Sequence, residues 1–246
     1  MLVLLPPSET KAEGGAGAPL DLATLSFPEL NPVRAKVADA LVELADDLPA
    51  SLAALGISAR QEAEVARNRM LYGSPTMPAL RRYTGVLYDA LDIGSLTPAR
   101  RRHAHERLAV CSALFGLVRA TDQIPAYRCS GGSGLPSLGP LPALWRPALE
   151  PVLAAVDDLV VDLRSGSYVA LARVPGAVTV RVVTEGPGGK RLTVSHFNKA
   201  AKGRLARALG SVTAAPDTVA KVLTVASRAG IRLERTGEHQ LELIDE

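Results

Sequence analysis

Cysteine, histidine and aromatic residues are all scarce in this sequence of 246 residues. It has 2 cysteines and 4 histidines, and they nowhere stand at the spacing of a metal-ligand set. His103 and His105 are two residues apart, so on a helix they would lie on different faces. The sequence therefore predicts no metal site and no cofactor, and its low cysteine content fits a reducing compartment.

Long apolar runs and long charge runs are absent as well. No apolar run is long enough to span a bilayer, and no charged-then-apolar signal peptide is found. We therefore expect a cytoplasmic protein with no membrane contact. With 47% hydrophobic residues the chain can bury a large core, and we expect one compact domain over residues 1–246. The net charge of +3 does not by itself identify a nucleic-acid binder.

The two cysteines occupy different surroundings. Cys111 lies in the apolar run LAVCSALFGLV and is expected in the core, whereas Cys129 lies in a polar, glycine-rich loop where its thiol could be exposed. Nothing in the sequence indicates a lowered pKa or a resolving partner for Cys129. A redox role for Cys129 therefore stays a secondary alternative.

Strand and helix patterns alternate along the chain, which predicts a mixed α/β (α+β) fold with a mixed sheet flanked by helices. Expected strands are MLVLL, LAVCSALFGLV with a turn near Gly116, LVVDL, a hairpin of VTVRVVTE and RLTVS joined by GPGG, IRLER and HQLELI. Expected helices begin at Asn31-Pro32, after Ser58 (to about Met70), at Thr97-Pro98, near Trp145 (to about Val156) and near Asp217 (to about Ala229). Tyr83, Gly85 and Tyr88 group on helical turns, where core packing is the default.

The segment SHFNKAAKGRLARAL, residues 195–209, best separates apolar from ionic residues. On a helix its apolar residues share one side, while Lys199, Lys202 and Arg207 share the other and Arg204 lies at the edge. Asn198 could cap the first turn. Four cations with no acid among them are suited to binding a phosphate. Gly203 inside a helix costs up to about 1 kcal/mol of stability relative to alanine, so we expect another group to approach the helix closely at this position. A solvated basic face over a small-residue packing contact is the alternative.

Polar loops follow three of the expected strands. Ligands gather at the carboxyl ends of strands in α/β folds, so these loops supply site candidates. The candidates are Ser8, Glu9, Thr10 and Lys11 after the first strand, Arg119, Asp122, Tyr127 and Arg128 after the second, and Arg164, Ser165 and Tyr168 after LVVDL. The alternatives are flexible surface turns and, for Asp122, pairing with an arginine to brace its loop.

These candidates have possible roles if the loops converge. Lys11, Arg128 and Lys199 would hold an anion, and Glu9 or Asp122 would act as a base, with Tyr127 a further catalytic candidate. If the first two strands are neighbours, Lys11 and Arg128 face the same crevice. No catalytic triad is recognisable, so the sequence leaves open whether there is turnover.

Five segments, in order, carry a family likeness. LLPPSETK, YTGVLYDAL, CSALFGLVRATDQIPAYR, DLRSGSY and SHFNKAAKGRLAR together resemble the YaaA family of bacterial peroxide-stress proteins over nearly the whole chain. The resemblance implies the family's own mixed α/β fold with a helix-hairpin-helix element, to which LPSLGPLPAL bears a faint likeness. It also implies a cytosolic protein that limits free intracellular iron and oxidative damage under hydrogen peroxide.

The resemblance further implies affinity for double-stranded and branched DNA, with Lys199, Lys202 and Arg204 among the DNA-facing residues. Three hypotheses follow: a DNA-binding stress protein without turnover, an enzyme acting on a nucleotide or other anionic small molecule, and a protein-binding regulator without a ligand. A DNA surface needs cations spread along an open groove, whereas a pocket needs them to converge and lose water. We expect both DNA affinity and a pocket lined by Ser8, Lys11, Arg119, Arg128, Ser165, Tyr168, Lys199, Lys202 and Arg204.

Overall fold

Five parallel strands form the centre of the sheet among the residues that the computed structural model describes, which are 1–186, 191–193 and 198–245. In spatial order these strands are β13 (Gln240–Ile244), β10 (Val178–Glu185), β9 (Val160–Asp162), β1 (Leu2–Leu5) and β4 (Leu108–Ser112). Every residue of β1, β4 and β9 is buried, which explains why these strands read as short apolar runs. Antiparallel β12 (Leu233–Gly237) and β5 (Gly116–Arg119) close the two edges, and β11 (Arg191–Thr193) pairs with β10.

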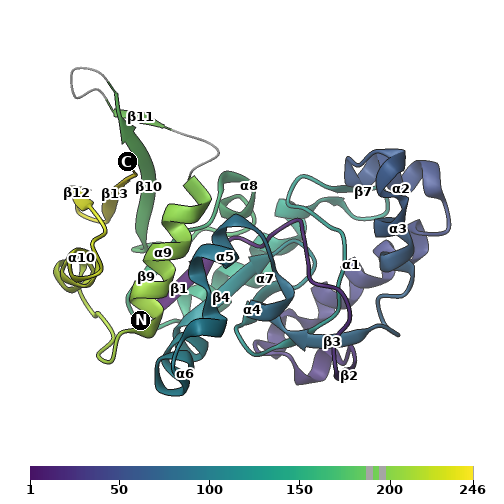
Figure 1. Cartoon of the computed structure of the whole chain (residues 1–246). Helices are drawn as coiled ribbons and strands as arrows, with labels where there is room; N and C mark the ends of the chain where they lie inside the picture. The colour runs from purple at the N-terminus through teal and green to yellow at the C-terminus, as the bar shows by residue number, and fades with distance from the viewer. Residues whose placement is uncertain (187–190, 194–197, 246) are drawn as a thin grey trace.

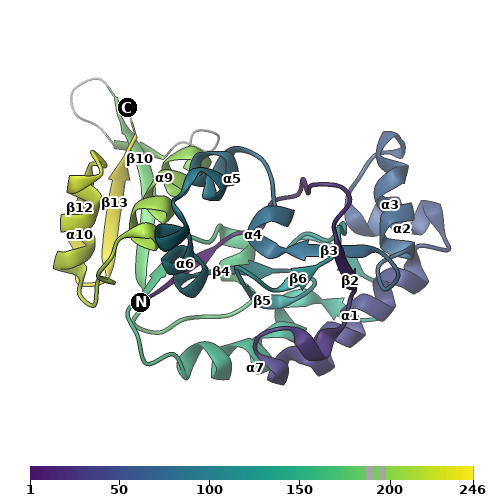
Figure 2. The ribbon, with the colours of Figure 1, turned by 60° about the horizontal axis from the view of Figure 1, so that its bottom comes forward.

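Helices cover both faces of this sheet (Figures 1 and 2). One face carries α5 (Val86–Leu91), α6 (Pro98–Arg107), α9 (Asn198–Ser211) and α10 (Val219–Arg228), and the other carries α1 (Asn31–Leu44) and α7 (Leu141–Ala154). Helix α9 contacts β1 and β10 on one side and α5, α6 and α10 on others. It is therefore an inner helix rather than one with a single buried face.

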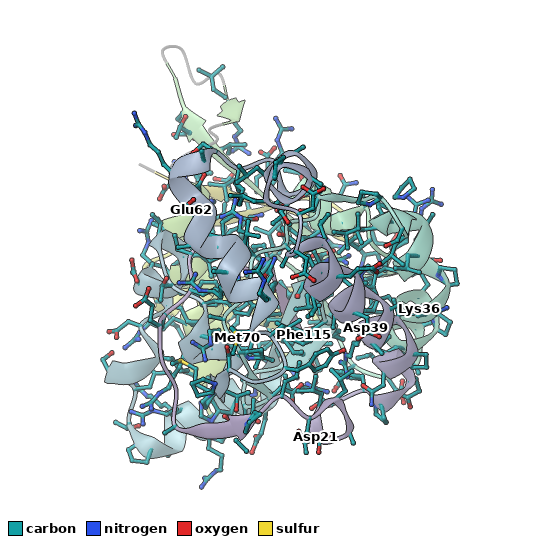
Figure 3. The ribbon with its side chains drawn as sticks, turned by 90° about the vertical axis from the view of Figure 1, so that its right-hand side faces the viewer. Asp21, Lys36, Asp39, Glu62, Met70 and Phe115 are labelled. Atoms are coloured by element: carbon teal, nitrogen blue, oxygen red, sulfur yellow. The ribbon has the colours of Figure 1, made fainter. Side chains whose placement is uncertain are left out.

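The opposite end of the molecule is built from short elements. They are α2 (Leu48–Leu55), α3 (Glu62–Arg69), α4 (Ala79–Arg82), the small sheet of β2 (Gly17–Pro19), β3 (Pro75–Pro78) and β6 (Gln123–Ile124), and the hairpin of β7 (Gly134–Leu135) and β8 (Gly139–Pro140). Figure 3 views the α1–α3 end, where Lys36, Asp39 and Glu62 are exposed. A further short helix, α8 (Gly166–Val169), lies near α9, beside the carboxyl end of β9.

Most predicted elements are confirmed, and their caps explain why. The Thr97 side chain accepts the Arg100 N–H at the start of α6, and Ser58 and Gln61 form a capping box before α3. The β10–β11 hairpin is antiparallel as predicted, whereas part of its GPGG turn lies outside the described residues.

One expectation is wrong in detail. Asn31 does not cap α1 and instead accepts a hydrogen bond from the Arg34 guanidinium, because Leu30 already occupies the capping position. The run LAVCSALFGLV forms two antiparallel strands, β4 and β5, with the turn near Gly116 that the sequence predicts, and the φ of 68° at Gly116 suits glycine. Helix α2 is not anticipated. The cap proposed for Asn198, with Ser195–Phe197 before it, concerns side chains outside the described part of the chain.

The predicted helix-hairpin-helix element is unconfirmed. The β7–β8 hairpin leads directly into α7, but residues 125–133 before the hairpin are not helical. Among the described residues, no helix is both long enough and apolar enough to cross a membrane.

Candidate functional site

A cavity of about 450 Å³ opens between the loop after β1, the start of α5, the loop after β9 and the start of α9. We call it the α5–α9 cavity. Its lining residues are Pro6, Pro7, Ser8, Glu9, Thr10, Thr84, Gly85, Val86, Leu87, Tyr88, Ser165, Ser167, Tyr168, Lys199 and Lys202. Because β1 and β9 are parallel neighbours, their carboxyl ends deliver both loops to one edge of the sheet, as the strand-exit argument predicts.

The Ser8–Thr10 segment is held close to the start of α5. The Ser8 and Thr10 hydroxyls are 3.1 Å apart, and the Thr10 hydroxyl donates to the Thr84 carbonyl. Gly85 has a φ of 92°, and a Cβ there would stand 3.2 Å from the Thr10 hydroxyl oxygen. Glycine thus permits both the backbone turn and the close approach of the two segments.

Glu9 is the acidic residue of the cavity. Its Oε1 accepts a hydrogen bond of 3.2 Å from the Tyr168 hydroxyl, and its Oε2 lies 3.5 Å from Arg128 Nη2 as an ion pair. Oε2 is buried and has no hydrogen-bond partner, and the same holds for Arg128 Nε. Burial, followed by the charge of Glu9, raises the pKa of Tyr168, so this phenol remains a donor at neutral pH.

Lys11 lies behind Glu9 and is only 8% exposed. Its Nζ donates to the Ser8 carbonyl over 3.0 Å and stands 4.1 Å from the centre of the Tyr127 ring. Burial lowers the pKa of Lys11 to about 8, with Glu9 opposing and Arg128 adding to that shift. Lys11 and Arg128 therefore both lie next to Glu9, Arg128 at its carboxylate and Lys11 at its backbone carbonyl, but neither of them lines the cavity as expected.

Tyr127 belongs to a buried chain of hydroxyls rather than to the cavity wall. Its hydroxyl lies 2.8 Å from those of both Tyr83 and Ser112, and all three residues are buried. The Tyr88 hydroxyl donates to the Pro6 carbonyl, so the clustered tyrosines pack in the core with satisfied hydroxyls, as the default predicts. The rings of Tyr83 and Tyr127, which carry two of these hydroxyls, contact the Lys11 ammonium.

Helix α9 brings two lysines to the cavity. Lys199 is exposed, and no described residue pairs with it. Lys202 donates to the Leu163 and Arg164 carbonyls over 3.0 and 3.2 Å, and burial lowers its pKa. A Cβ on Gly203 would meet the Leu87 carbonyl oxygen at 2.2 Å, so this glycine lets α9 approach α5, a cavity wall.

Three predicted site residues lie elsewhere because other groups engage them. Arg204 pairs with Asp245 at the end of β13. Arg119 donates to the Glu106 carbonyl and lies over the Phe27 ring. Asp122 accepts hydrogen bonds from Ser26 and from the Arg119 N–H, which braces its loop. The bracing alternative for Asp122 is thus the one that the geometry supports, although the donor is a backbone amide and not a guanidinium.

Both cysteines are buried. Cys111 is in the core as expected, whereas the expectation of an exposed Cys129 is wrong, since it is 1% exposed. Burial raises the pKa of Cys129 to about 12, so it is a thiol and not a reactive thiolate near neutral pH. Arg164, another strand-exit candidate, forms a buried ion pair with Asp162 rather than facing a ligand.

Eight cavity residues are not predicted as site residues from the sequence: Pro6, Pro7, Thr84, Gly85, Val86, Leu87, Tyr88 and Ser167. In the sequence, the grouping of Tyr83, Gly85 and Tyr88 indicates a tight turn. In the structure this turn is at Gly85, whose φ is positive, directly before α5. No pattern in the sequence indicates that this turn lies opposite the start of α9, since 110 or more residues separate them.

Comparisons with known proteins agree with this architecture. The family model for the peroxide stress protein YaaA matches residues 1–230. A UPF0246 protein of Corynebacterium efficiens is 51% identical over 238 residues, covering 95% of each chain, and one of Streptomyces coelicolor is 47% identical over 241 residues, covering 95% of this chain and 92% of its own. An uncharacterized protein of Campylobacter jejuni is 29% identical over 83% of this chain and 82% of its own. By the extent of the family match and by these identities, the chain belongs to the YaaA family of peroxide stress proteins.

Proposed function

We propose that this peroxide-stress protein works through the α5–α9 cavity, which binds an anionic small molecule. The observation that carries the proposal is the convergence of Lys199 and Lys202 on one cavity, with Lys11 and Arg128 behind its single lining carboxylate, Glu9. Four cations surround one acid there, and walls of low dielectric strengthen their field. An anion entering the cavity would gain from Lys199, to which no described residue offers a counter-ion.

The volume and the lining fit a small ligand. Binding sites for small molecules are usually concave, of about 300–1,000 Å³, with apolar walls and a few polar groups that orient the ligand. The cavity meets this description with about 450 Å³, the apolar Pro7 and Val86, and the hydroxyls of Ser8 and Ser165. The proposal extends to catalytic turnover of this ligand, with Glu9 as the general base. Glu9 is preferred to Asp122 because the Asp122 carboxylate already accepts hydrogen bonds from Ser26 and from the Arg119 N–H.

Thermal unfolding with a panel of anions tests the proposal. Inorganic phosphate, pyrophosphate and the common nucleotides should raise the midpoint of the wild type for at least one compound, since a ligand at 100 times its Kd stabilises by about 2.7 kcal/mol. Lys199→Ala should weaken that ligand at least fivefold. Lys36→Ala, an exposed lysine on α1, should match the wild type. No shift with any anion, or equal shifts in Lys199→Ala, would contradict the proposal.

DNA binding is a second candidate function, and helix α6 favours it more than α9 does. Lys202 is engaged by carbonyls and Arg204 by Asp245, so α9 offers no open row of cations. Arg81, Arg100 and Arg102 are exposed, and no ion pair neutralises them within the described chain. Arg81 also helps to lower the pKa of His105, after burial and Arg101, so its charge lies within electrostatic reach of α6.

Salt dependence separates the two surfaces. Each phosphate contact removed lowers the slope of log K against log salt by about 0.9 for duplex DNA. Replacing Arg100 and Arg102 with alanine should therefore reduce the slope by about 2 if each contacts one phosphate, whereas Arg204→Ala should leave it unchanged. A slope that falls with Arg204→Ala instead would return the DNA surface to α9.

We propose that the protein acts in the cytoplasm, and that binding of the cavity ligand there limits free iron and oxidative DNA damage. A deletion strain under hydrogen peroxide, complemented with the wild type or with Lys199→Ala, tests this assignment by its free iron level. Equal rescue by both would separate iron control from the cavity.

A further inference from the structure

We infer that the ligand of the α5–α9 cavity is a ribonucleotide, with its ribose hydroxyls on Glu9, its phosphate at Lys199 and Lys202, and its base against Pro7 and Val86. This inference rests on the proposed anion-binding function of the cavity and names the class of anion. It follows from three different parts of the cavity wall.

The first part is the carboxylate. An ionised carboxylate only accepts hydrogen bonds and has about four lone-pair positions for them. Glu9 uses one of these positions for the Tyr168 hydroxyl, and its buried Oε2 lies beside Arg128, while the side chain as a whole is 40% exposed and lines the cavity. A ligand that fills this cavity must therefore offer hydroxyl or N–H donors next to Glu9, which sulfate lacks and which phosphate offers only through its own acidic O–H groups.

The second part is the balance of charge. A bare carboxylate would repel an anionic ligand, but Arg128 lies 3.5 Å from the Glu9 carboxylate, and the Lys11 ammonium, which donates to the Glu9 backbone carbonyl, is close enough to interact with its charge. Lys11 and Arg128 do not line the cavity, so they offset the charge of Glu9 without competing for the ligand. Lys199 then remains for the negative group of the ligand, together with the third ammonium proton of Lys202, whose other two are donated to the Leu163 and Arg164 carbonyls. The cavity is thus bipolar, with an acceptor end and a cationic end.

The third part is the apolar wall. Val86 is 51% exposed and Pro7 is half-buried, and the buried Leu87 lies behind them. A sugar phosphate alone would leave this wall in water, whereas a planar base would cover it. An anion, adjacent hydroxyls and a flat apolar group together describe a nucleotide, and a carboxylate paired with vicinal hydroxyls is a usual way to recognise ribose.

Titration with paired nucleotides tests the inference on the native protein. The four ribonucleoside 5′-monophosphates and their 2′,3′-dideoxy counterparts are measured by calorimetry, with inorganic phosphate as the small-anion probe. We expect at least one ribonucleotide to bind tenfold or more tightly than its dideoxy counterpart. Glu9→Gln should shrink that ratio to about threefold or less while phosphate affinity falls less than threefold. Glu13→Gln, an acid of the same loop that is 86% exposed and lies outside the cavity, should keep the full ratio.

The outcomes distinguish the inference from the function beneath it. Equal affinities for a ribonucleotide and its dideoxy counterpart, or an unchanged ratio in Glu9→Gln, would overturn the inference while leaving an anion-binding cavity. Binding of phosphate and of no nucleotide would overturn it too. Absence of binding by every probe would overturn the proposed function itself. The ratio in the wild type decides the matter even if Glu9→Gln folds poorly.

Discussion

Glu9, in the loop after β1, and Asp122, in the loop after β5, are both acids near the end of a strand, and the two carboxylates are used differently. Asp122 accepts hydrogen bonds from the Ser26 N–H, the Ser26 hydroxyl and the Arg119 N–H. Glu9 accepts one from Tyr168 and has a buried oxygen that accepts none. Both acids follow strands of one sheet, so residue type and position alone do not separate them.

Hydrogen-bond saturation is what separates the two loops. A carboxylate whose lone pairs are filled by backbone and side-chain donors stabilises the fold and has little capacity left for a ligand. The cations show the same contrast. Arg34, beside the Asp122 loop, is fully buried and donates to the Phe115, Leu117 and Ser26 carbonyls, while Lys199 beside the Glu9 loop has no described partner.

The largest expected effect is at Arg34. Replacing it with leucine leaves the Phe115, Leu117 and Ser26 carbonyls without donors, and at about 1–3 kcal/mol for each orphaned group we expect a loss near 4 kcal/mol. Chemical denaturation measures the free energy of unfolding. Arg228→Leu, at an exposed arginine of α10, is the control and should change it by under about 0.5 kcal/mol. A loss below 1 kcal/mol for Arg34→Leu would contradict the view that the hydrogen bonds from Arg34 to backbone carbonyls stabilise this loop.

The two acids themselves provide the next test. Asp122→Ala should cost about 2–4 kcal/mol because three donors lose their acceptor, whereas Glu9→Ala should cost under about 1 kcal/mol. The same denaturation experiment compares both variants at pH 7. Equal losses would remove the distinction between a bracing carboxylate and an available one.

Gly203 tests how closely the cavity wall is packed. Gly203→Ala places a Cβ against the Leu87 backbone carbonyl, so we expect a loss of about 2–3 kcal/mol from overpacking, despite the better helix propensity of alanine. Gly94→Ala, where a Cβ meets nothing within 4 Å and φ is not positive, is the matched control. Thermal midpoints of both variants report the difference, and a more stable Gly203→Ala would show that α9 does not pack against α5 as described.

Lys11 gives the smallest effect, seen as a dependence on pH. The pKa of Lys11 is lowered to about 8 in the folded protein, whereas a lysine in the unfolded chain keeps the ordinary value of 10.5. Between these two pH values the unfolded chain therefore binds more protons than the folded protein. The unfolding free energy of the wild type should therefore rise with pH relative to Lys11→Met, by about 2 kcal/mol from pH 7 to pH 9.5 at 1.36 kcal/mol per pKa unit.

Other charged and aromatic groups lie close to Lys11, which is why the variant is needed. Glu9, Arg128, Glu64, Cys129 and Tyr127 all lie close enough to act on its charge or ring contact. Subtracting the Lys11→Met profile removes the contributions that the two proteins share. Parallel profiles over this range would mean that the buried ammonium does not lose its proton near pH 8.

Sequence periodicity and caps determined most of the elements. The apolar runs at β1, β4 and β9 lie in the parallel centre of the sheet, and Thr97 begins α6 as expected. These signals are local, since a strand buried on both faces and a capped first turn depend on a few neighbouring residues. The placement of Ser8, Glu9 and Tyr168 on one cavity was also expected, because parallel strands end at the same edge of the sheet.

Only the tertiary structure decided which polar residues remain for a ligand. Nothing in the sequence near Asp122, Arg204 or Cys129 indicates that Ser26, Asp245 or the core will cover them, because the first two contacts join residues 96 and 41 positions apart and the third depends on burial. Composition determined that a basic helix would exist, but the packing of α9 against β1 and α5 turned its cations toward separate partners. A charge is available to a ligand only when folding leaves it unpaired, and pairing is a property of distances in space.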